Sequence, residues 1–160
     1  MTEPVNLYNI YMGDFSSSAS QEMMNLMDYA AANLGGSPWF QIKTAYYQIN
    51  PNLSRTYESG NASFISRVQL LPTARGLSIN DSFIIQSLMD LFNAQKIAVD
   101  ETAVYNFIFR GDFQLSGWLS TWCGYHHAFY LSDGRIVKYT VIGDSSTAAD
   151  GGACQAIVGK

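Results

Sequence analysis

The residues best suited to catalysis or metal binding lie close together, between Cys123 and His127. The chain has two histidines, His126 and His127, and two cysteines, Cys123 and Cys154. Adjacent histidines on a strand point to opposite faces, which prevents one metal ion from using both. A zinc site needs three or four His, Cys or carboxylate ligands, and this stretch supplies only Cys123 and His126. We therefore expect no metal site and no cofactor.

Cys123 has two competing uses. As a nucleophile it requires an activated thiolate and an oriented base, for which His126 is the candidate. The sequence offers no third group that would orient His126. The alternative is a disulfide with Cys154, which an extracellular setting favours. Closing that loop of about 30 residues would stabilise the fold by about 3–4 kcal/mol in the chain-entropy description.

The carboxylates form no recognisable acid–base pair. They are spread along the chain, mostly where helix caps and turns are expected, as at Asp81 and Asp133. No Ser/His/Asp order and no pair of carboxylates at a catalytic spacing stands out. We assign no catalytic residue, and the sequence favours a non-enzyme without deciding the matter.

Trp39, Tyr46 and Tyr47 form an aromatic cluster that suggests binding. Aromatic faces stack on sugar rings, so the cluster is a candidate carbohydrate platform, and His126 is a further candidate for binding. The competing interpretation is that an aromatic stripe at helical spacing belongs to the core. Both interpretations stay open at this point.

The first elements that would position these residues are a strand and a helix. The strand is expected at residues 5–12, with bulky side chains on both faces, which is typical of a strand covered on two sides. In the helix, Ser18 and Gln21 make a capping box at the start, and Gly35-Gly36 supplies a left-handed stop.

Four more elements lie between this helix and the last two strands. They are a helix at residues 37–49, a strand at 62–71, a helix from Ser78 with Asp81 completing its capping box, and a strand at 103–109. In the second strand, alternation places Phe64 and Val68 on the same face.

The Asp133-Gly134 dipeptide predicts a β-hairpin between two β-rich runs, residues 125–132 and 135–142. This dipeptide favours the mirror-image turn that matches the twist of paired strands. A two-residue loop would place His126 opposite Val141 and Ala128 opposite Tyr139.

The order of elements indicates an α/β fold of the mixed α+β kind. We expect a central mixed β-sheet with about three helices packed on it and a C-terminal β-hairpin. A length of 160 residues fits one domain.

Composition narrows the classes of function. The chain is 48% hydrophobic and only 14% charged, with a net charge of -4, and such a surface suits an extracellular protein. Scattered arginines without a basic cluster exclude nucleic-acid binding, and no apolar run approaches the roughly 20 residues that span a bilayer. Met1 is not followed by a leader pattern. Three sequons, at Asn52, Asn61 and Asn80, would accept glycans in the secretory path.

Several segments together resemble the exordium family, also called phosphate-induced proteins. The segments that carry the resemblance are Asn9 to Phe15, Pro38-Trp39-Phe40 with Tyr46-Tyr47, Leu77 to Asp81, Gly117-Trp118 leading to Cys123-Gly124-Tyr125-His126, Val141 to Ser145, and Cys154-Gln155-Ala156. They run through nearly all of the chain in the family's order, and as an ordered set they are more specific than any one of them.

The resemblance implies a single exordium-like domain, residues 1–160, that is incomplete at its C-terminus and is secreted to the cell-wall space or the extracellular medium. The family is linked to growth and cell expansion and has no established enzymatic activity to transfer to named residues. We therefore expect an extracellular protein, non-enzymatic as it stands, that acts by binding a ligand such as a cell-wall polysaccharide. A separate carbohydrate-binding module is one alternative.

Two departures from the family pattern shape these expectations. Family members carry two further cysteines, at the positions of Leu119 and Ala149, and this matched loss favours a Cys123–Cys154 disulfide over a nucleophile. Members also continue well beyond Lys160, and in some the continuation resembles the His-Glu helix of zinc peptidases. The second alternative is therefore a fragment, the N-terminal half of a zinc metallopeptidase-like enzyme without its metal-ligand helix. A sheet cut at that place would self-associate through exposed apolar surface.

Overall fold

The computed structural model describes residues 3–71, 78–110, 113–115 and 122–143. In chain order the elements are β1 (Val5–Met12), α1 (Ser18–Ala32), α2 (Pro38–Gln41), the 3-10 helix η1 (Ile42–Ala45), β2 (Tyr47–Ile49), β3 (Arg55–Tyr57), β4 (Ala62–Leu70), β5 (Ser78–Ile79), α3 (Asp81–Asn93), β6 (Ala103–Phe109), β7 (Gln114–Leu115), β8 (Gly124–Tyr130) and β9 (Ile136–Gly143).

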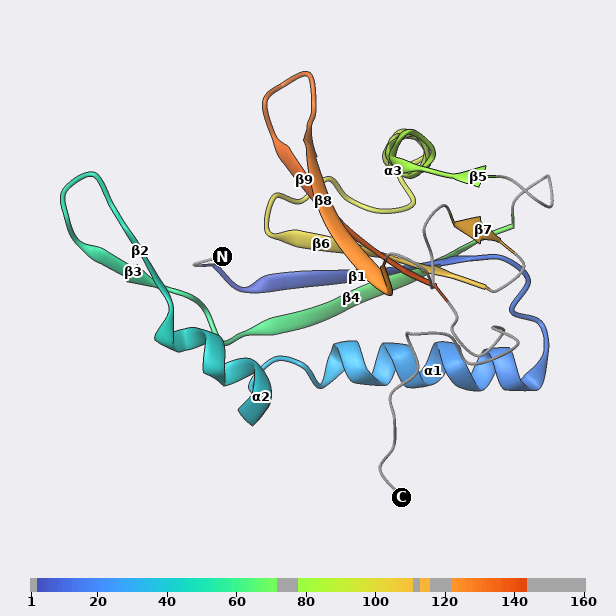
Figure 1. The fold of residues 1–160 in the computed structure, drawn as a ribbon, viewed down its shortest axis with the longest axis horizontal. Helices are drawn as coiled ribbons and strands as arrows, with labels where there is room; N and C mark the ends of the chain where they lie inside the picture. Colours follow the sequence, from blue (N-terminus) through green and yellow to red (C-terminus); the bar gives the residue numbers. More distant parts are fainter. Residues whose placement is uncertain (1–2, 72–77, 111–112, 116–121, 144–160) are drawn as a thin grey trace.

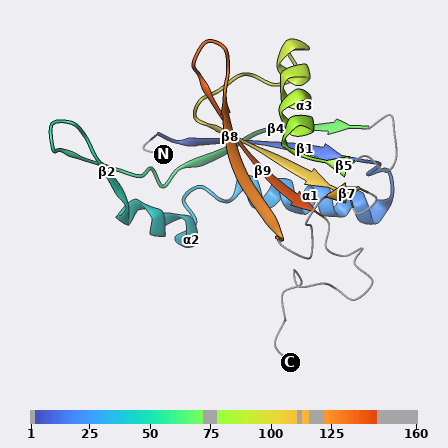
Figure 2. The same ribbon diagram turned by 45° about the horizontal axis from the view of Figure 1, so that its top comes forward.

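The centre of the fold is a five-stranded mixed sheet in the order β4-β1-β6-β9-β8. Strands β4, β1, β6 and β9 are parallel, and β8 pairs antiparallel with β9 as a hairpin. Helix α1 lies against one face and α3 against the other (Figures 1 and 2). The mixed sheet, its helices and the C-terminal hairpin are as the sequence predicts. Within the described residues, every helix is too short or too polar to cross a membrane.

Strand β1 is buried on both faces, which confirms the expectation from its bulky alternation. Tyr8 and Ile10 pack in the large core beneath α3, with the inward side chains of β6 and β9. Leu7 and Tyr11 point to the other face, into two smaller clusters under α1. A strand between two helical layers has no solvated face, which is why its pattern lacks polar alternation.

Both long helices begin at a residue other than the predicted cap. The cap of α1 is Ser17, whose hydroxyl accepts from the amide of Ser20. The cap of α3 is Asn80, whose side chain accepts from the amide of Phe83, so Asp81 lies in the first turn. Neighbouring Ser, Asn and Asp residues compete as caps, and the tertiary position of the chain decides which one is used.

The second helix is shorter than predicted. Helix α2 has four residues and η1 another four, and Tyr46 is already extended. Phe40 is its only side chain packed on a described apolar cluster. Because the rest of the stripe faces no core, nothing compensates for the weak helix propensity of its aromatic and β-branched residues. The chain forms the β2–β3 hairpin instead, which was not predicted.

An irregularity in β4 overturns its predicted alternation. Register shifts between Leu7 and Tyr8 of β1, which pair with Phe64 and Ser66, so one residue of β4 is skipped. A bulge of this kind changes which side chains share a face. Phe64 therefore packs on the α1 side, whereas Val68 packs on the α3 side.

The register of the β8–β9 hairpin differs by one residue from the prediction. Leu131 donates its amide to the carbonyl of Arg135 at 2.9 Å, and Gly134 donates to Leu131 at 2.9 Å. The loop thus has three residues, with Gly134 at a φ of 87°, the form that combines a type I turn with a left-handed glycine. As a consequence His126 lies opposite Thr140, not Val141.

Candidate binding surfaces

Residues 37–60 form an arm that leaves the body of the protein beside α1 and returns to it at β4 (Figures 1 and 2). Its two ends are joined, because the amide of Gly36 donates to the carbonyl of Gly60 at 3.1 Å. At the root, a Cβ on Gly35 would lie 2.2 Å from the carbonyl oxygen of Ala62. Only glycine permits so close an approach of two backbones, and this contact fixes where the arm starts.

Four aromatic side chains of the arm are exposed and do not belong to the core, whereas Phe40 is half-buried against an apolar cluster. Trp39 is 72% exposed and Tyr46 is 67% exposed, with Tyr47 at 42% and Tyr57 at 53%. The apolar side chains of Ile42, Ile49 and Leu53 are exposed on the same arm. The structure therefore decides against the core interpretation of Trp39, Tyr46 and Tyr47. An apolar surface of this extent is usually a place of interaction.

The β2–β3 hairpin presents its rings on one face. Tyr47 and Tyr57 are directly opposite in register, and their ring centroids are 5.5 Å apart. The guanidinium of Arg55 lies over the Tyr47 ring, 4.5 Å from its centroid. The turn is held by Asn50, whose side-chain amide donates to the hydroxyls of Ser54 and Thr56 at 2.8 and 2.7 Å. The ribbon is thereby ordered without a core of its own.

Trp39 and Tyr46 are the open rings of the arm. Arg55 covers Tyr47, and the ammonium of Lys43 lies 4.2 Å from the centroid of the Phe40 ring. Trp39 and Tyr46, in contrast, have neither an aromatic nor a cationic partner among the described residues. Their faces are accessible to a ligand. Tyr57 was not recognised from the sequence, because it lies in a polar segment whose pairing with Tyr47 depends on an unpredicted hairpin.

A second candidate surface is the face of β6, β9 and β8 beside α1. Polar residues in strict register cross the sheet there: Arg67 on β4, Asn9 on β1, Asn106 on β6, Thr140 on β9 and His126 on β8. Thr140 donates to the Asn106 side-chain oxygen at 2.8 Å, and Asn106 donates to that of Asn9 at 3.1 Å. This polar row was not predicted, because the alignment of five strands cannot be read from one sequence.

The row ends on a carboxylate of α1. Asn9, which is only 2% exposed, donates to Asp28 at 2.8 Å, and the Tyr11 hydroxyl donates to the same oxygen at 2.7 Å. Arg67 bonds the other oxygen of Asp28 at 3.0 Å. Burial, together with the Asp28 carboxylate, raises the pKa of Tyr11 far above its ordinary value. The row therefore fastens α1 to the sheet.

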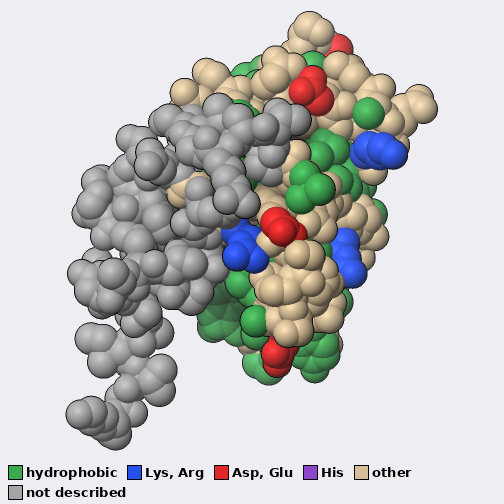
Figure 3. All heavy atoms as spheres, turned by 90° about the vertical axis from the view of Figure 1, so that its right-hand side faces the viewer, with side chains coloured by type: hydrophobic (Ala, Val, Ile, Leu, Met, Phe, Trp, Pro, Cys, Tyr) green, Lys and Arg blue, Asp and Glu red, His purple; other side chains and the backbone are tan. Residues whose placement is uncertain are grey.

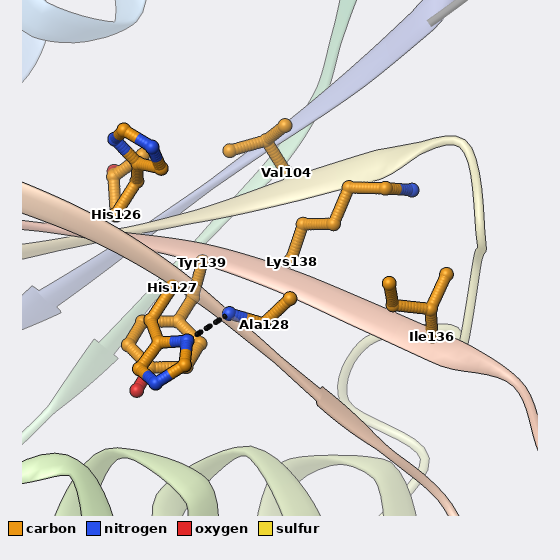
Figure 4. Close-up of a pocket in the computed structure, with 8 residues that line it drawn as sticks. Val104, His126, His127, Ala128, Ile136, Lys138 and Tyr139 are labelled. Atoms are coloured by element: carbon orange, nitrogen blue, oxygen red, sulfur yellow. Dashed lines mark hydrogen bonds between the residues drawn. The ribbon is translucent and has the colours of Figure 1, made fainter.

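His126 lies at the open end of this row. It borders a hollow of about 670 Å³ together with Val104, Lys138 and Thr140. In Figure 4 the His126 ring lies on the same side of the strands as Val104 and Lys138, and the His127 ring lies on the opposite side, against Tyr139. The expectation that the two histidines face opposite ways is confirmed. His126 thus has no second imidazole beside it, and the ammonium of Lys138 donates to the carbonyl of Glu101.

On the α3 side, Asp81 joins the hairpin to the helix. Its Oδ1 accepts from the Tyr139 hydroxyl at 2.6 Å and from the Tyr125 hydroxyl at 2.9 Å. Burial, and then these hydrogen bonds to Asp81, raise the pKa of both phenols well above the ordinary range. The tyrosines therefore remain neutral donors at physiological pH and serve to attach the hairpin.

The carboxyl ends of β1 and β6 are where open α/β sheets commonly bind ligands. Here the guanidinium of Arg110 donates to the carbonyl of Asp14 at 2.6 Å and to the hydroxyl of Ser20 at 2.7 Å. These bonds hold the loop after β1 against the start of α1. Figure 3 views this end of the molecule, and its visible charged side chains are interspersed, without a block of one sign.

The remaining predicted residues do not assemble into a site. Cys123 is exposed at the start of β8 and is not a free thiol, whereas Cys154 lies outside the described residues, so its pairing with Cys123 stays a prediction. Asn52 and Asn61 are exposed, and Asn80 caps α3 with its side chain. Among the described residues no group of three His, Cys, Asp or Glu side chains converges as metal ligands would.

Comparison with family models, with curated proteins and with solved structures found no match to this chain.

Proposed function

We propose that this chain is an extracellular, non-enzymatic binding protein of the exordium type, and that it binds polysaccharide with the aromatic arm. The observation that supports this most directly is the exposure of Trp39 and Tyr46, at 72% and 67%. Both residues open onto solvent from a segment in which Phe40 is the one described side chain of its helical part that packs on an apolar cluster of the body. A ring with no role in packing is available for a ligand.

Two features of the arm favour a sugar as the ligand. Its rings carry polar groups, the tyrosine hydroxyls and the tryptophan indole N–H, which suit a surface that is apolar on its face and hydroxylated at its edge. Its two basic groups, Lys43 and Arg55, lie over Phe40 and Tyr47. The arm therefore presents rings without a block of charge, and a neutral polysaccharide chain with flat sugar faces complements such a surface.

The binding test is a titration with soluble neutral wall polysaccharides, followed by tryptophan fluorescence and by calorimetry. Trp39→Ala and Tyr46→Ala should each weaken binding at least tenfold, about 1.4 kcal/mol, because few aromatic anchors carry most of a binding energy. Tyr29→Ala is the matched control, since Tyr29 is an equally exposed tyrosine, 68%, on α1. If the affinity and the heat of binding in both arm variants equal those of the wild type, the arm is excluded as the binding surface.

A protein ligand is the competing outcome of this experiment. If no neutral polysaccharide binds but the arm variants still lose an interaction with an extracellular protein, the sugar part of the proposal is wrong. The arm itself would then remain the binding surface. Measuring both ligands on the same three variants separates the two cases.

The extracellular part of the proposal has its own test. A secreted protein would carry a Cys123–Cys154 disulfide, and Asn52 would be the most accessible of the glycan acceptors because it lies in the exposed β2–β3 turn. The intact mass of the secreted chain is measured after alkylation, with and without prior reduction. The mass of two alkyl groups should be added only when the chain is reduced first. Two thiols that react in the native protein would contradict the proposal.

A further inference from the structure

The two edges of the sheet are protected very differently. Edge strand β4 has a bulge near Ile65 and the charged side chain of Arg67, and both features discourage pairing with another strand. Edge strand β8, residues Gly124–Tyr130, contains no Lys, Arg, Asp, Glu or Pro. It has no neighbour on its outer side among the described residues. Among the described residues, β8 is therefore an edge at which another strand can pair.

The hydrogen bonding at the turn determines which backbone N–H and C=O groups of β8 point away from β9. Because Leu131 donates its amide to Arg135 on β9, the alternation of an antiparallel ladder points the amides of every second residue before it toward β9. The groups of Gly124, His126, Ala128 and Tyr130 therefore point outward. One of them is already covered, since Nδ1 of His127 accepts from the Ala128 amide at 2.7 Å (Figure 4).

We propose that β8 is a self-association strand, and that a second copy of this chain pairs with it antiparallel about a two-fold axis at His127. In this register the outward groups of His126 meet those of Ala128 of the second copy, and Gly124 meets Tyr130. The two five-stranded sheets would then form one continuous sheet of ten strands. The Ala128 amide exchanges its bond to His127 for one to the second copy.

Self-complementarity is the reason for choosing a second copy as the occupant. A two-fold interface uses the same patch twice, and because β8 contains no Lys, Arg, Asp or Glu, this axis sets no two such charges opposite each other. On the α3 side Tyr125 faces Phe129 of the second copy, an aromatic pair that occurs twice. On the other side Tyr130, 74% exposed in one copy, covers Gly124 of the other, as aromatic rings do for glycines in sheets.

The test is sedimentation equilibrium, with Ala128→Pro as the disrupting variant. Proline removes an outward amide while the bonds to β9 remain, so the hairpin tolerates it. Two intermolecular hydrogen bonds are lost per dimer, which should weaken dimerisation about 30-fold, or about 2 kcal/mol. Ser132→Pro is the control, because Ser132 occupies the turn position at which proline is preferred.

Amide exchange gives a second, independent measurement. Dimerisation should slow exchange at His126 and Tyr130, whereas the Tyr125 and Phe129 amides, bonded to β9, should be slow at every concentration. If circular dichroism shows Ala128→Pro to be unfolded, His126→Lys replaces it as the disrupting variant. A wild-type chain that stays monomeric at about 100 μM overturns the proposal. A dimer that neither Ala128→Pro nor His126→Lys weakens overturns it as well.

Discussion

Replacing Asn9 with aspartate perturbs the polar row at its most buried point while keeping the size of the side chain. Asn9 is 2% exposed and donates to Asp28 at 2.8 Å, and it accepts from Asn106 at 3.1 Å. The substitution removes the donated bond and sets one carboxylate beside another. If the row fastens α1 to the sheet, Asn9→Asp should loosen that attachment.

The cost follows from the distances. Two like charges about 4 Å apart repel by about 4 kcal/mol at an effective dielectric constant near 20, and a lost hydrogen bond to a charged acceptor adds about 1.5–3 kcal/mol. Protonation of the new carboxyl limits the sum, so we expect a loss of about 3–5 kcal/mol near pH 7. That is a large part of the 5–15 kcal/mol that stabilises an ordinary domain.

The loss should also depend on pH in one direction. Burial and the neighbouring Asp28 raise the pKa of the introduced carboxyl above its unfolded value of about 3.9. Because the folded pKa is the higher one, the destabilisation is absent below the unfolded pKa and grows as pH rises through the folded pKa. The variant should approach wild-type stability near pH 4 and fall behind it near pH 7.

Urea unfolding at both pH values measures the effect. Gln48→Glu is the matched control, because it adds the same charge at an exposed position of β2, and it should change stability by less than about 0.5 kcal/mol. A loss under about 1 kcal/mol for Asn9→Asp near pH 7, or an equal loss at both pH values, would refute the reasoning about the row.

Two further outcomes are expected. Gly35→Ala should destabilise the chain by about 1–3 kcal/mol, because its Cβ would lie 2.2 Å from a β4 backbone oxygen; Gly36→Ala, with a φ of 75° and open space around it, should cost only about 1 kcal/mol in thermal unfolding. Asp81→Asn should lower the pH at which Tyr125 and Tyr139 ionise, measured by phenolate absorbance, because it removes the negative charge of the acceptor that helps to raise their pKa. Those raised values favour folding below about pH 10 and lose that effect as pH rises through the folded pKa. The variant, whose shift is smaller, should therefore be less stable near neutral pH and lose less further stability than the wild type above about pH 10.

The elements that sequence patterns predicted well are those whose patterns are local. Strand β6 occupies residues 103–109 as expected, and the double-sided burial of β1 follows from bulky side chains at every position. The hairpin is where Asp133-Gly134 indicates a turn. In each case neighbours in the chain determine the outcome, either through alternation of faces or through the conformation that glycine permits.

Features that depend on contacts between distant segments were not predictable. One residue of loop length decides whether His126 faces Thr140 or Val141, because a slip of one residue moves a strand's side chains to the opposite face. The aromatic residues of the arm fit a helical stripe equally well whether or not a core lies beside them. The sequence therefore named Trp39, Tyr46 and Tyr47 without showing that they are exposed.

The arm and the β8 edge together predict how a polymeric ligand should bind. A dimer formed through β8 presents two arms, so a long polysaccharide can engage both. Once the first arm is bound, binding of the second arm is intramolecular, which raises the apparent affinity although each arm makes the same contacts as before. A short oligosaccharide reaches one arm only. Ala128→Pro should therefore weaken binding of the long chain by at least tenfold and leave that of the oligosaccharide unchanged, whereas Trp39→Ala should weaken both. Equal losses of both ligands in Ala128→Pro would mean that β8 affects the arm directly and that valency has no part in binding.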